Sequence, residues 1–317
     1  MKTVQGTAGL PQDVKPSVAT IGVFDGVHVG HQMLLKKVVD EARARDAKAV
    51  VVTFDRHPLE LLSPPDAPQL ITTLRQRAEV FEALGIDMLL VLRFDDRLRN
   101  LEPDQFVDRV LVDALGAVHL VVGENFRFGH GGAGSVEMLA ELGKERGFTV
   151  EVFSLLEGAG GGDGASQPAV SSSLIRRQLA DGDVEHVAEE LGRPFRLEGH
   201  VVRGAGRGRG LGIPTANLDV PAKVILPKVG IYAGWMEHAG ERHPAVINIG
   251  YNPTFEERDR PIVEVHALDF DGDLYGRVIG VEFTHRLRDE RKFPDADSLM
   301  EEIRRDIARA RDLLGVG

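Results

Sequence analysis

The hydrophobic pattern of this chain changes near residues 192–194, and this change constrains the fold more than any other feature. Before it, short β-branched runs such as residues 18–23 alternate with longer runs, such as residues 31–45, whose apolar positions recur at helical spacing. After it, short strand-like runs separated by Gly, Pro, Asn and Asp follow one another until a final helical pattern at residues 298–314. The chain therefore contains two different structural modules.

Each pattern predicts its own fold class. Repeated strand–helix units predict a parallel sheet covered by helices on both faces, in which ligands bind at the carboxyl ends of the strands. Closely spaced strands predict a small antiparallel barrel or sandwich. The 317 residues suffice for two domains of about 150 residues each. We predict an N-terminal α/β domain over residues 1–186 and a C-terminal β-barrel domain, closed by a helix, over residues 187–317.

Composition excludes several classes of protein and site. The chain has no cysteine, which excludes a disulfide framework, a thiolate zinc site, an iron–sulfur cluster and a cysteine nucleophile. Its 38 basic and 49 acidic residues give a net charge of −11, which argues against a nucleic-acid partner. No apolar run suits a signal peptide or a membrane helix, so we expect a cytoplasmic protein without a membrane partner.

The 36 glycines are concentrated in a few places. Nineteen of them fall in residues 22–30, 123–134, 158–164 and 199–212. Because glycine lets the backbone approach a ligand closely, we interpret the first, second and fourth segments as ligand loops. The third has no periodicity and is typical of a flexible linker.

The first glycine segment contains two histidines. The sequence Gly-Val-Phe-Asp-Gly-Val-His-Val-Gly-His, residues 22–31, lies between a predicted strand and a predicted helix. Glycines and a helix N-terminus both favour phosphate, and two imidazoles three residues apart can donate hydrogen bonds to it. The alternative is a turn with two solvated histidines. The flanking strand, the Phe-Asp-Gly sequence and the helix favour the phosphate site.

The fourth glycine segment contains three arginines within residues 199–212 and is followed by Ile-Pro-Thr-Ala-Asn, residues 213–217. Alone it is typical of a flexible Arg/Gly segment that binds nucleic acid, but the strands that follow anchor it. Glu264 lies in an alternating strand, on the face opposite Val263 and Val265. By pattern alone it is either an ordinary solvent-facing carboxylate or a functional one.

Several motifs, in the same order, resemble one known family. Residues 22–31 resemble the HxGH form found in bacterial bifunctional riboflavin kinase/FMN adenylyltransferases (FAD synthetases). Residues 123–129 (Gly-Glu-Asn-Phe-Arg-Phe-Gly) and 170–176 (Val-Ser-Ser-Ser-Leu-Ile-Arg) are similar to that family's second and third motifs, and residues 212–217 to its GxPTAN motif. The resemblance covers essentially the whole chain. It implies a Rossmann-like nucleotidyltransferase domain followed by a riboflavin-kinase-type barrel.

The resemblance implies roles for N-terminal residues. His28 and His31 would bind ATP phosphates and stabilise charge that develops at the α-phosphorus. The flavin would face Asn125, Phe126 and Phe128. Nucleotide contacts would also come from two loops, the first with Gly22, Phe24, Asp25 and Gly30 and the second with Ser172, Ser173 and Arg176. The family usually has threonine where this chain has Ser173, a change that keeps the hydroxyl.

The resemblance implies a second site in the C-terminal half. Thr215 and Asn217 would hold Mg²⁺ and the ATP phosphates, and Glu264 would take the proton from the riboflavin 5′-hydroxyl. The loop that covers the phosphates would include Gly204, Gly210 and Gly212. The family commonly has an acid near Ala205, which this chain lacks. The implied ligands are Mg²⁺, ATP, riboflavin, FMN and FAD; the sequence does not indicate the oligomeric state.

Other patterns leave alternatives open. Residues 129–134 match GxGxxG, but they do not directly follow a strand, so we interpret them as a turn near the flavin. Residues 55–57 (Asp-Arg-His) could line the N-terminal pocket or form a satisfied loop cluster. Two other functions are an adenylyltransferase with another phosphorylated acceptor and a non-catalytic barrel, and a nucleic-acid-binding protein that uses the Arg/Gly segment.

Overall fold

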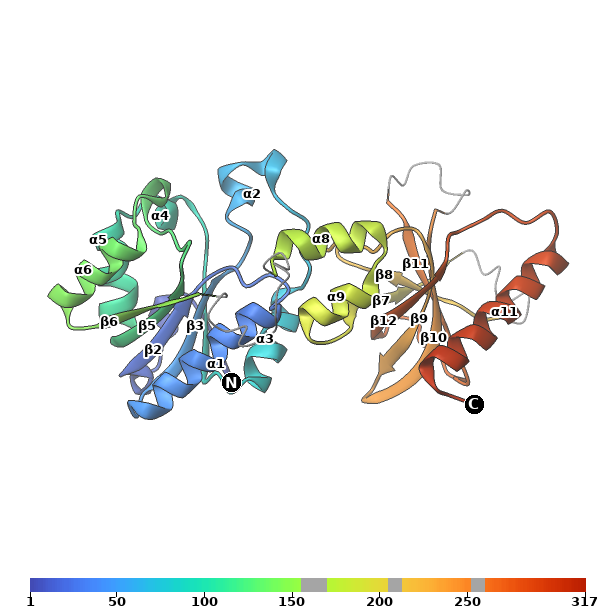
Figure 1. Ribbon diagram of the computed structural model, residues 1–317, viewed down its shortest axis with the longest axis horizontal. Helices are drawn as coiled ribbons and strands as arrows, with labels where there is room; N and C mark the ends of the chain where they lie inside the picture. Colours follow the sequence, from blue (N-terminus) through green and yellow to red (C-terminus); the bar gives the residue numbers. More distant parts are fainter. Residues whose placement is uncertain (155–169, 205–212, 252–259) are drawn as a thin grey trace, which may run out of the picture. The chain divides into compact units, whose positions relative to one another are not determined.

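The computed structural model describes residues 1–154, 170–204, 213–251 and 260–317 (Figure 1). Contacts divide the chain into two units. Unit 1 comprises Met1–Gln69 and Thr73–Ser171, and unit 2 comprises Leu70–Thr72 and Ser172–Gly317. Among the described residues, no helix is both long enough and apolar enough to cross a membrane.

Unit 1 is built on a parallel sheet of six strands in the order β1-β4-β3-β2-β5-β6. The inner strands β2 and β4 are buried along their whole length, as expected for a parallel sheet covered on both faces. The strands are β1 (Lys2–Gln5), β2 (Ser17–Ile21), β3 (Lys48–Phe54), β4 (Met88–Leu92), β5 (Ala117–Gly123) and β6 (Thr149–Phe153).

Helices cover both faces of this sheet (Figure 1). Val51 packs into a cluster with α1 and α3, whereas its neighbours Val50 and Val52 pack into another with α5, η4 and α6, because successive side chains of a strand point to opposite faces. The helices are α1 (Val29–Ala44), α2 (Leu59–Leu62), α3 (Leu74–Ala83), α4 (Asp96–Arg99), α5 (Pro103–Phe106), η4 (Val107–Ala114) and α6 (Val136–Arg146). The short 3₁₀ turns are η1 (Thr7–Gly9), η2 (Gln12–Val14), η3 (Pro64–Asp66) and η5 (His130–Gly132).

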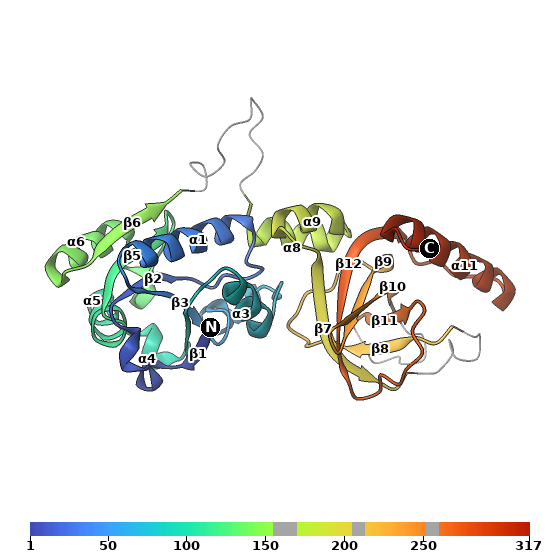
Figure 2. The ribbon, with the colours of Figure 1, turned by 90° about the horizontal axis from the view of Figure 1, so that it is seen from below.

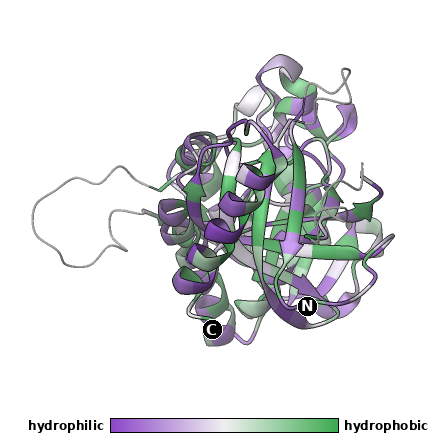
Figure 3. Cartoon of the chain, turned by 90° about the vertical axis from the view of Figure 1, so that its right-hand side faces the viewer, coloured by the Kyte–Doolittle hydropathy of each residue, from purple (hydrophilic) through white to green (hydrophobic). Residues whose placement is uncertain are grey.

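Unit 2 is an antiparallel closed barrel in the order β10-β11-β8-β7-β12-β9, seen at the right of Figure 2. The parallel sheet, the barrel and the final helix confirm the predicted fold class. Hydrophobic residues are concentrated on the strands of the chain (Figure 3). The elements are α8 (Ser172–Asp181), α9 (Val184–Leu191), β7 (Phe195–Val202), β8 (Ala216–Asp219), β9 (Gly230–His238), β10 (Glu241–Gly250), β11 (Ile262–Ala267), β12 (Val278–Arg288) and α11 (Ala296–Leu314).

The core of unit 2 includes a residue from far upstream in the chain. The backbone N–H of Leu70 donates to the carbonyl of Lys223 at 2.7 Å, and the N–H of Ile225 donates to the carbonyl of Leu70 at 2.9 Å. Ile71 follows Leu70 directly, and its side chain is fully buried in the apolar cluster of unit 2. Residues 70–72 therefore belong structurally to the barrel.

The contact units and the predicted domains are defined by different criteria. Contacts place α8 and α9 with the barrel, whereas the predicted limit at residues 186/187 assigns α8 to the N-terminal domain. The contact units do not test the predicted domain limits, so 1–186 and 187–317 stay a prediction.

Two candidate active sites

The first candidate site lies in unit 1, where β2 ends at Ile21 and α1 begins at Val29. Between them the chain turns sharply, with φ of +53° at Phe24 and +43° at Val27. The Val27 N–H donates to the Phe24 carbonyl at 3.1 Å, and the Gln32 side chain donates to the Val27 carbonyl at 2.8 Å. These bonds hold residues 22–28 in one conformation at the carboxyl edge of the sheet.

The two predicted histidines meet at the N-terminus of α1. His28 is the N-cap, and its Nδ1 accepts a hydrogen bond from the backbone N–H of His31 at 3.3 Å. The two rings stack with centroids 3.6 Å apart and planes inclined by 19°, and the ring of Phe24 packs edge-on against His31. Because the helix dipole favours negative charge at this end, the pair is well placed to bind a phosphate group.

Both histidines are neutral at physiological pH. Burial lowers the pKa of His28 to about 4, although the negative charge of Asp25 opposes the shift. Burial also holds the pKa of His31 well below its usual range, and its electrostatic interaction with His28 lowers it further. Since the Nδ1 of His28 accepts a hydrogen bond, its proton lies on Nε2, which can donate to an anion. The Nδ1 of His31 is buried and has no hydrogen-bond partner among the described residues.

A buried arginine from α3 supports this loop. Arg77 is 3% exposed, donates to the carbonyl of Val23 and lies 3.4 Å from the hydroxyl of Thr53. Burial lowers its pKa, while the charge of Asp25 raises it. Arg77 was not among the predicted site residues. Its signal in the sequence is an arginine at one of the positions whose spacing places them on the buried face of α3.

The predicted flavin residues follow β5, which lies next to β2 in the sheet. Asn125 is exposed, and the rings of Phe126 and Phe128 stack with centroids 5.6 Å apart. Phe128 is buried at 6% exposure in the core of unit 1, and a Cβ on Gly134 would lie 2.7 Å from its ring. Gly134 thus serves close packing against Phe128, and Gly129 serves close packing against Pro103. The flavin-binding roles stay a prediction.

Two other groups of residues, 55–57 and 172–176, were considered in the sequence as parts of the N-terminal site. Asp55 accepts a hydrogen bond from the N–H of Phe94 at 2.9 Å and pairs with Arg56 at 3.2 Å, which are the contacts of a satisfied loop cluster. In unit 2, the first two turns of α8 contain Ser172, Ser173 and Arg176. Their role in holding phosphate stays a prediction.

The second candidate site is a cavity of about 910 Å³ in unit 2. Its lining includes four residues singled out from the sequence, namely Gly204, Thr215, Asn217 and Glu264. A Cβ on Gly204 would overlap the amide of Asn217, so the backbone there lies directly against that side chain. Gly210 and Gly212, together with Ala205, lie outside the described residues.

Strand register explains how these residues meet. Val263 and Val265 are each 1% exposed inside the barrel, so Glu264 between them points to the other face, where the cavity lies. On that face Glu264 is paired with Asn217 of β8 on one side and with Asn248 of β10 on the other. The hydroxyl of Thr215 and the amide oxygen of Asn217 are ligands that suit a hard cation such as Mg²⁺.

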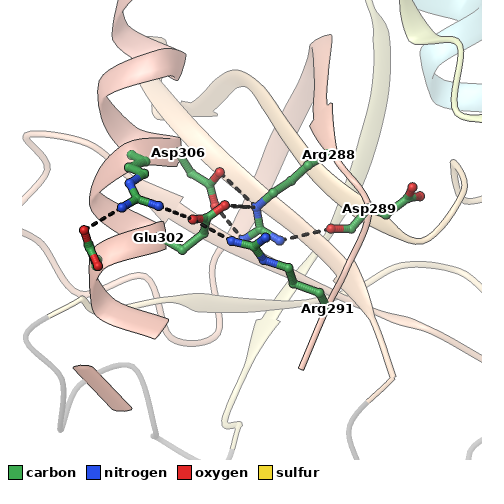
Figure 4. Close-up of polar contacts among 7 residues, drawn as sticks. Arg288, Asp289, Arg291, Glu302 and Asp306 are labelled. Carbon is green, nitrogen blue, oxygen red and sulfur yellow. Dashed lines mark hydrogen bonds and ion pairs between the residues drawn. The ribbon is translucent and has the colours of Figure 1, made fainter. Parts of the chain in front are cut away.

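Another part of the cavity lining comes from the end of β12, the segment after it and α11. Arg288 pairs with Asp306 of α11 through two nitrogens, at 3.0 and 2.7 Å, and Arg291 pairs with Glu302 at 2.7 Å (Figure 4). Arg288, Arg291 and Asp306 all line the cavity together with Phe293. In the sequence, the charged run at residues 286–292 is typical of solvated charges in a region that borders a flavin site. Its pairing with α11 depends on contacts between β12 and α11, which are invisible in a local charge pattern.

A further charged cluster lies elsewhere in unit 1. Single ligand atoms of Glu41, His119 and Glu151 lie within 4.8 Å of one another. Lys37 pairs with both carboxylates, at 2.8 and 3.1 Å, and Arg45 pairs with Glu41. Two cations thus balance the two carboxylates, and we interpret the cluster as a structural ion-pair network.

The fold and the two sites together define a two-domain enzyme that acts on nucleotides. Family models match consecutive parts of the chain: FAD synthetase over residues 10–162 and riboflavin kinase over residues 191–314. The chain belongs to the family of bifunctional riboflavin kinase/FMN adenylyltransferases, which confirms the resemblance found in the sequence.

Individual relatives support this assignment over the full length. The bifunctional riboflavin kinase/FMN adenylyltransferase of Pseudomonas fluorescens is 39% identical, with 99% of this chain and 98% of that protein covered. The protein of the same name from Escherichia coli K12 is 38% identical, with 100% and 99% covered. A crystal structure described as a macrolide-efflux protein from Streptococcus pneumoniae has a TM-score of 0.85 at 28% identity, covering 98% of this chain and 99% of that one. The fold is therefore shared throughout, and the alternative functions are not favoured.

Proposed function

We propose that this chain converts riboflavin to FAD in two ATP-dependent steps, riboflavin kinase activity in the C-terminal part and FMN adenylyltransferase activity in the N-terminal part. The observation that carries the proposal is that two family models match successive parts of one chain, each of which contains a candidate site. The first step converts riboflavin and ATP to FMN and ADP. The second converts FMN and ATP to FAD and pyrophosphate.

In the adenylyl transfer, a phosphate oxygen of FMN attacks the α-phosphorus of ATP and pyrophosphate leaves. His28 and His31 donate hydrogen bonds to the phosphate oxygens, where negative charge increases in the transition state. Because both imidazoles are neutral, they stabilise this charge as hydrogen-bond donors, and the N-terminus of α1 adds its positive potential. The predicted partners toward the flavin in this step are Asn125, Phe126 and Phe128. No covalent intermediate is needed.

In the kinase reaction, Glu264 accepts the proton of the riboflavin 5′-hydroxyl as that oxygen attacks the γ-phosphorus of ATP and ADP leaves. Thr215 and Asn217 would hold Mg²⁺, which supplies positive charge that offsets the phosphates. The closeness of Gly204 to Asn217 supports a role for the glycine loop in covering the nucleotide. We also propose a cytoplasmic location, since both reactions consume ATP.

The test is incubation of the purified protein with riboflavin, ATP and Mg²⁺, followed by chromatography of the flavins. We expect FMN to form first and FAD to follow, with one ADP per FMN and one pyrophosphate per FAD. Accumulation of neither flavin nucleotide would contradict the proposal. Formation of FMN alone would leave the kinase assignment standing and overturn the adenylyltransferase assignment.

A further inference from the structure

The turn between β2 and α1 contains backbone conformations that need support from outside the turn. Phe24 and Val27 both have a positive φ, which is uncommon for any residue except glycine and exceptional for a β-branched one such as Val27. Such conformations persist only where surrounding contacts fix them. Because this turn leads directly to His28 at the N-terminus of α1, contacts that fix the turn also fix the candidate phosphate site.

One face of α3 supplies two of these contacts. Arg77 and Phe81 are four residues apart, so their side chains lie on the same side of the helix, and both are buried. The guanidinium of Arg77 donates a hydrogen bond to the carbonyl of Val23. The ring of Phe81 packs edge-on against that of Phe24, with centroids 5.9 Å apart, and Phe24 packs edge-on against His31. Helix α3 therefore contacts the turn on both sides of the peptide bond between Val23 and Phe24.

The charge of Arg77 offsets a carboxylate in the same turn. Asp25 is 3% exposed, as is Arg77, so both groups are shielded from solvent. Burial lowers the pKa of Arg77, and the negative charge of Asp25 opposes that shift. Burial likewise lowers the pKa of His28, and Asp25 again opposes the shift. A buried carboxylate that acts on His28 in this way would also repel the phosphates of a nucleotide there, unless a cation offset its charge.

We propose that Arg77 is a positioning residue of the N-terminal site, which fixes the turn through the Val23 carbonyl and offsets the charge of Asp25, so that ATP phosphates can bind at the N-terminus of α1. This inference rests on the proposed FMN adenylyltransferase activity. Since Arg77 is buried against the turn, it acts through the turn and does not itself contact substrate. The role needs a positive charge and a hydrogen-bond donor, so an uncharged side chain of similar length cannot fill it.

The test compares Arg77→Met with Arg77→Lys in the full-length chain, by steady-state conversion of FMN and ATP to FAD. We expect Arg77→Met to lower kcat/KM for ATP about 100-fold, as for a buried charge left without its partner. Most of the loss should be a higher KM, because the uncompensated carboxylate repels bound ATP, whereas a partly unfolded preparation would lower kcat and leave KM unchanged. Arg77→Lys should stay within about tenfold of the wild type, since lysine keeps the charge and a donor. Equal losses in the two variants would overturn the proposal.

A second background separates charge from folding. In Asp25→Asn no carboxylate needs to be offset, so adding Arg77→Met should lower kcat/KM by less than about tenfold, as for one lost hydrogen bond. The effect of Asp25→Asn alone cancels in this ratio, and the double variant leaves neither charge buried alone if Arg77→Met does not fold. Arg75→Met is the control, because Arg75 is exposed on α3 and pairs with Glu79, and activity should stay within about twofold. The same loss in both backgrounds would overturn the inference, whereas a wild type that forms no FAD from FMN would overturn the proposed adenylyltransferase function itself.

Discussion

His28 is proposed to act as a neutral imidazole. Its low pKa in the folded protein makes the free energy of unfolding decrease in acid. The pKa is about 4 in the folded protein and 6.5 for an unperturbed side chain. Between these values the unfolded chain binds more protons, so folding becomes less favourable as the pH falls through this window. The stabilising contribution is fully present above pH 6.5 and lost below pH 4.

The matched variant for this effect is His28→Asn, because asparagine also caps a helix N-terminus well. We expect the free energy of unfolding of the wild type to fall by about 3 kcal/mol more than that of the variant between pH 7 and pH 4. Urea unfolding followed by circular dichroism at both pH values measures the difference. Equal losses in the two proteins would show that His28 is not buried in its neutral form.

Residues of the candidate sites differed in how far the sequence could predict them. His28 and His31, like Thr215 and Asn217, lie in short continuous motifs, so their spacing alone indicates a shared purpose. Arg77 could not be found in this way, since its partner Val23 is separated from it by most of two strand–helix units. The pairing of Arg288 with Asp306 could not be found in this way either, because it depends on how α11 packs against β12.

At the scale of elements, α11 holds one wall of the unit 2 cavity through Asp306. This carboxylate is 6% exposed and binds Arg288 through two nitrogens. Removing one partner of a buried ion pair leaves the other charge uncompensated, which typically costs about 3–5 kcal/mol. We therefore expect Asp306→Ala to destabilise the barrel and to impair riboflavin phosphorylation.

Trp235 in β9 is the single tryptophan of the chain, so its fluorescence reports the unfolding of unit 2. The control on the same helix is Glu301→Ala, whose exposed pair with Arg305 should contribute less than about 0.5 kcal/mol. If Asp306→Ala unfolds at the same urea concentration as Glu301→Ala, the ion pair does not hold this wall.

Sequence patterns indicate helix ends correctly where contacts between neighbouring residues determine them. The Thr73–Gln76 capping box, readable in the sequence, starts α3, and Asp183 caps α9. Residues 107–114 form a π-helix, although their apolar spacing is also typical of an α-helix. Hydrophobic spacing does not distinguish these two helices reliably, because both can bury a similar apolar stripe over two turns.

At the scale of the whole molecule, the two patterns in the sequence correspond to two separately packed cores, but the chain does not divide between them at a single point. Ile71 is fully buried among residues of the barrel unit although it precedes most of unit 1. Sequence patterns could not reveal this, since a three-residue segment is too short to show periodicity.

This arrangement predicts that Ile71→Ala destabilises unit 2. Removing a buried isoleucine side chain typically costs about 2–5 kcal/mol, so the urea midpoint of Trp235 fluorescence should fall markedly. Ile86→Ala, at a similarly buried position in the core of unit 1, is the control and should leave that midpoint much less changed. The opposite ranking of the two variants would contradict the assignment of residues 70–72 to the barrel.

The central claim is that one chain carries two chemically independent sites, and paired variants test it directly. In His28→Asn with His31→Ala, we expect conversion of FMN to FAD to fall at least about 100-fold while riboflavin phosphorylation stays within about twofold. In Glu264→Gln, phosphorylation should fall at least about 100-fold and FAD formation from FMN should persist. Loss of both activities in either folded variant would contradict the account.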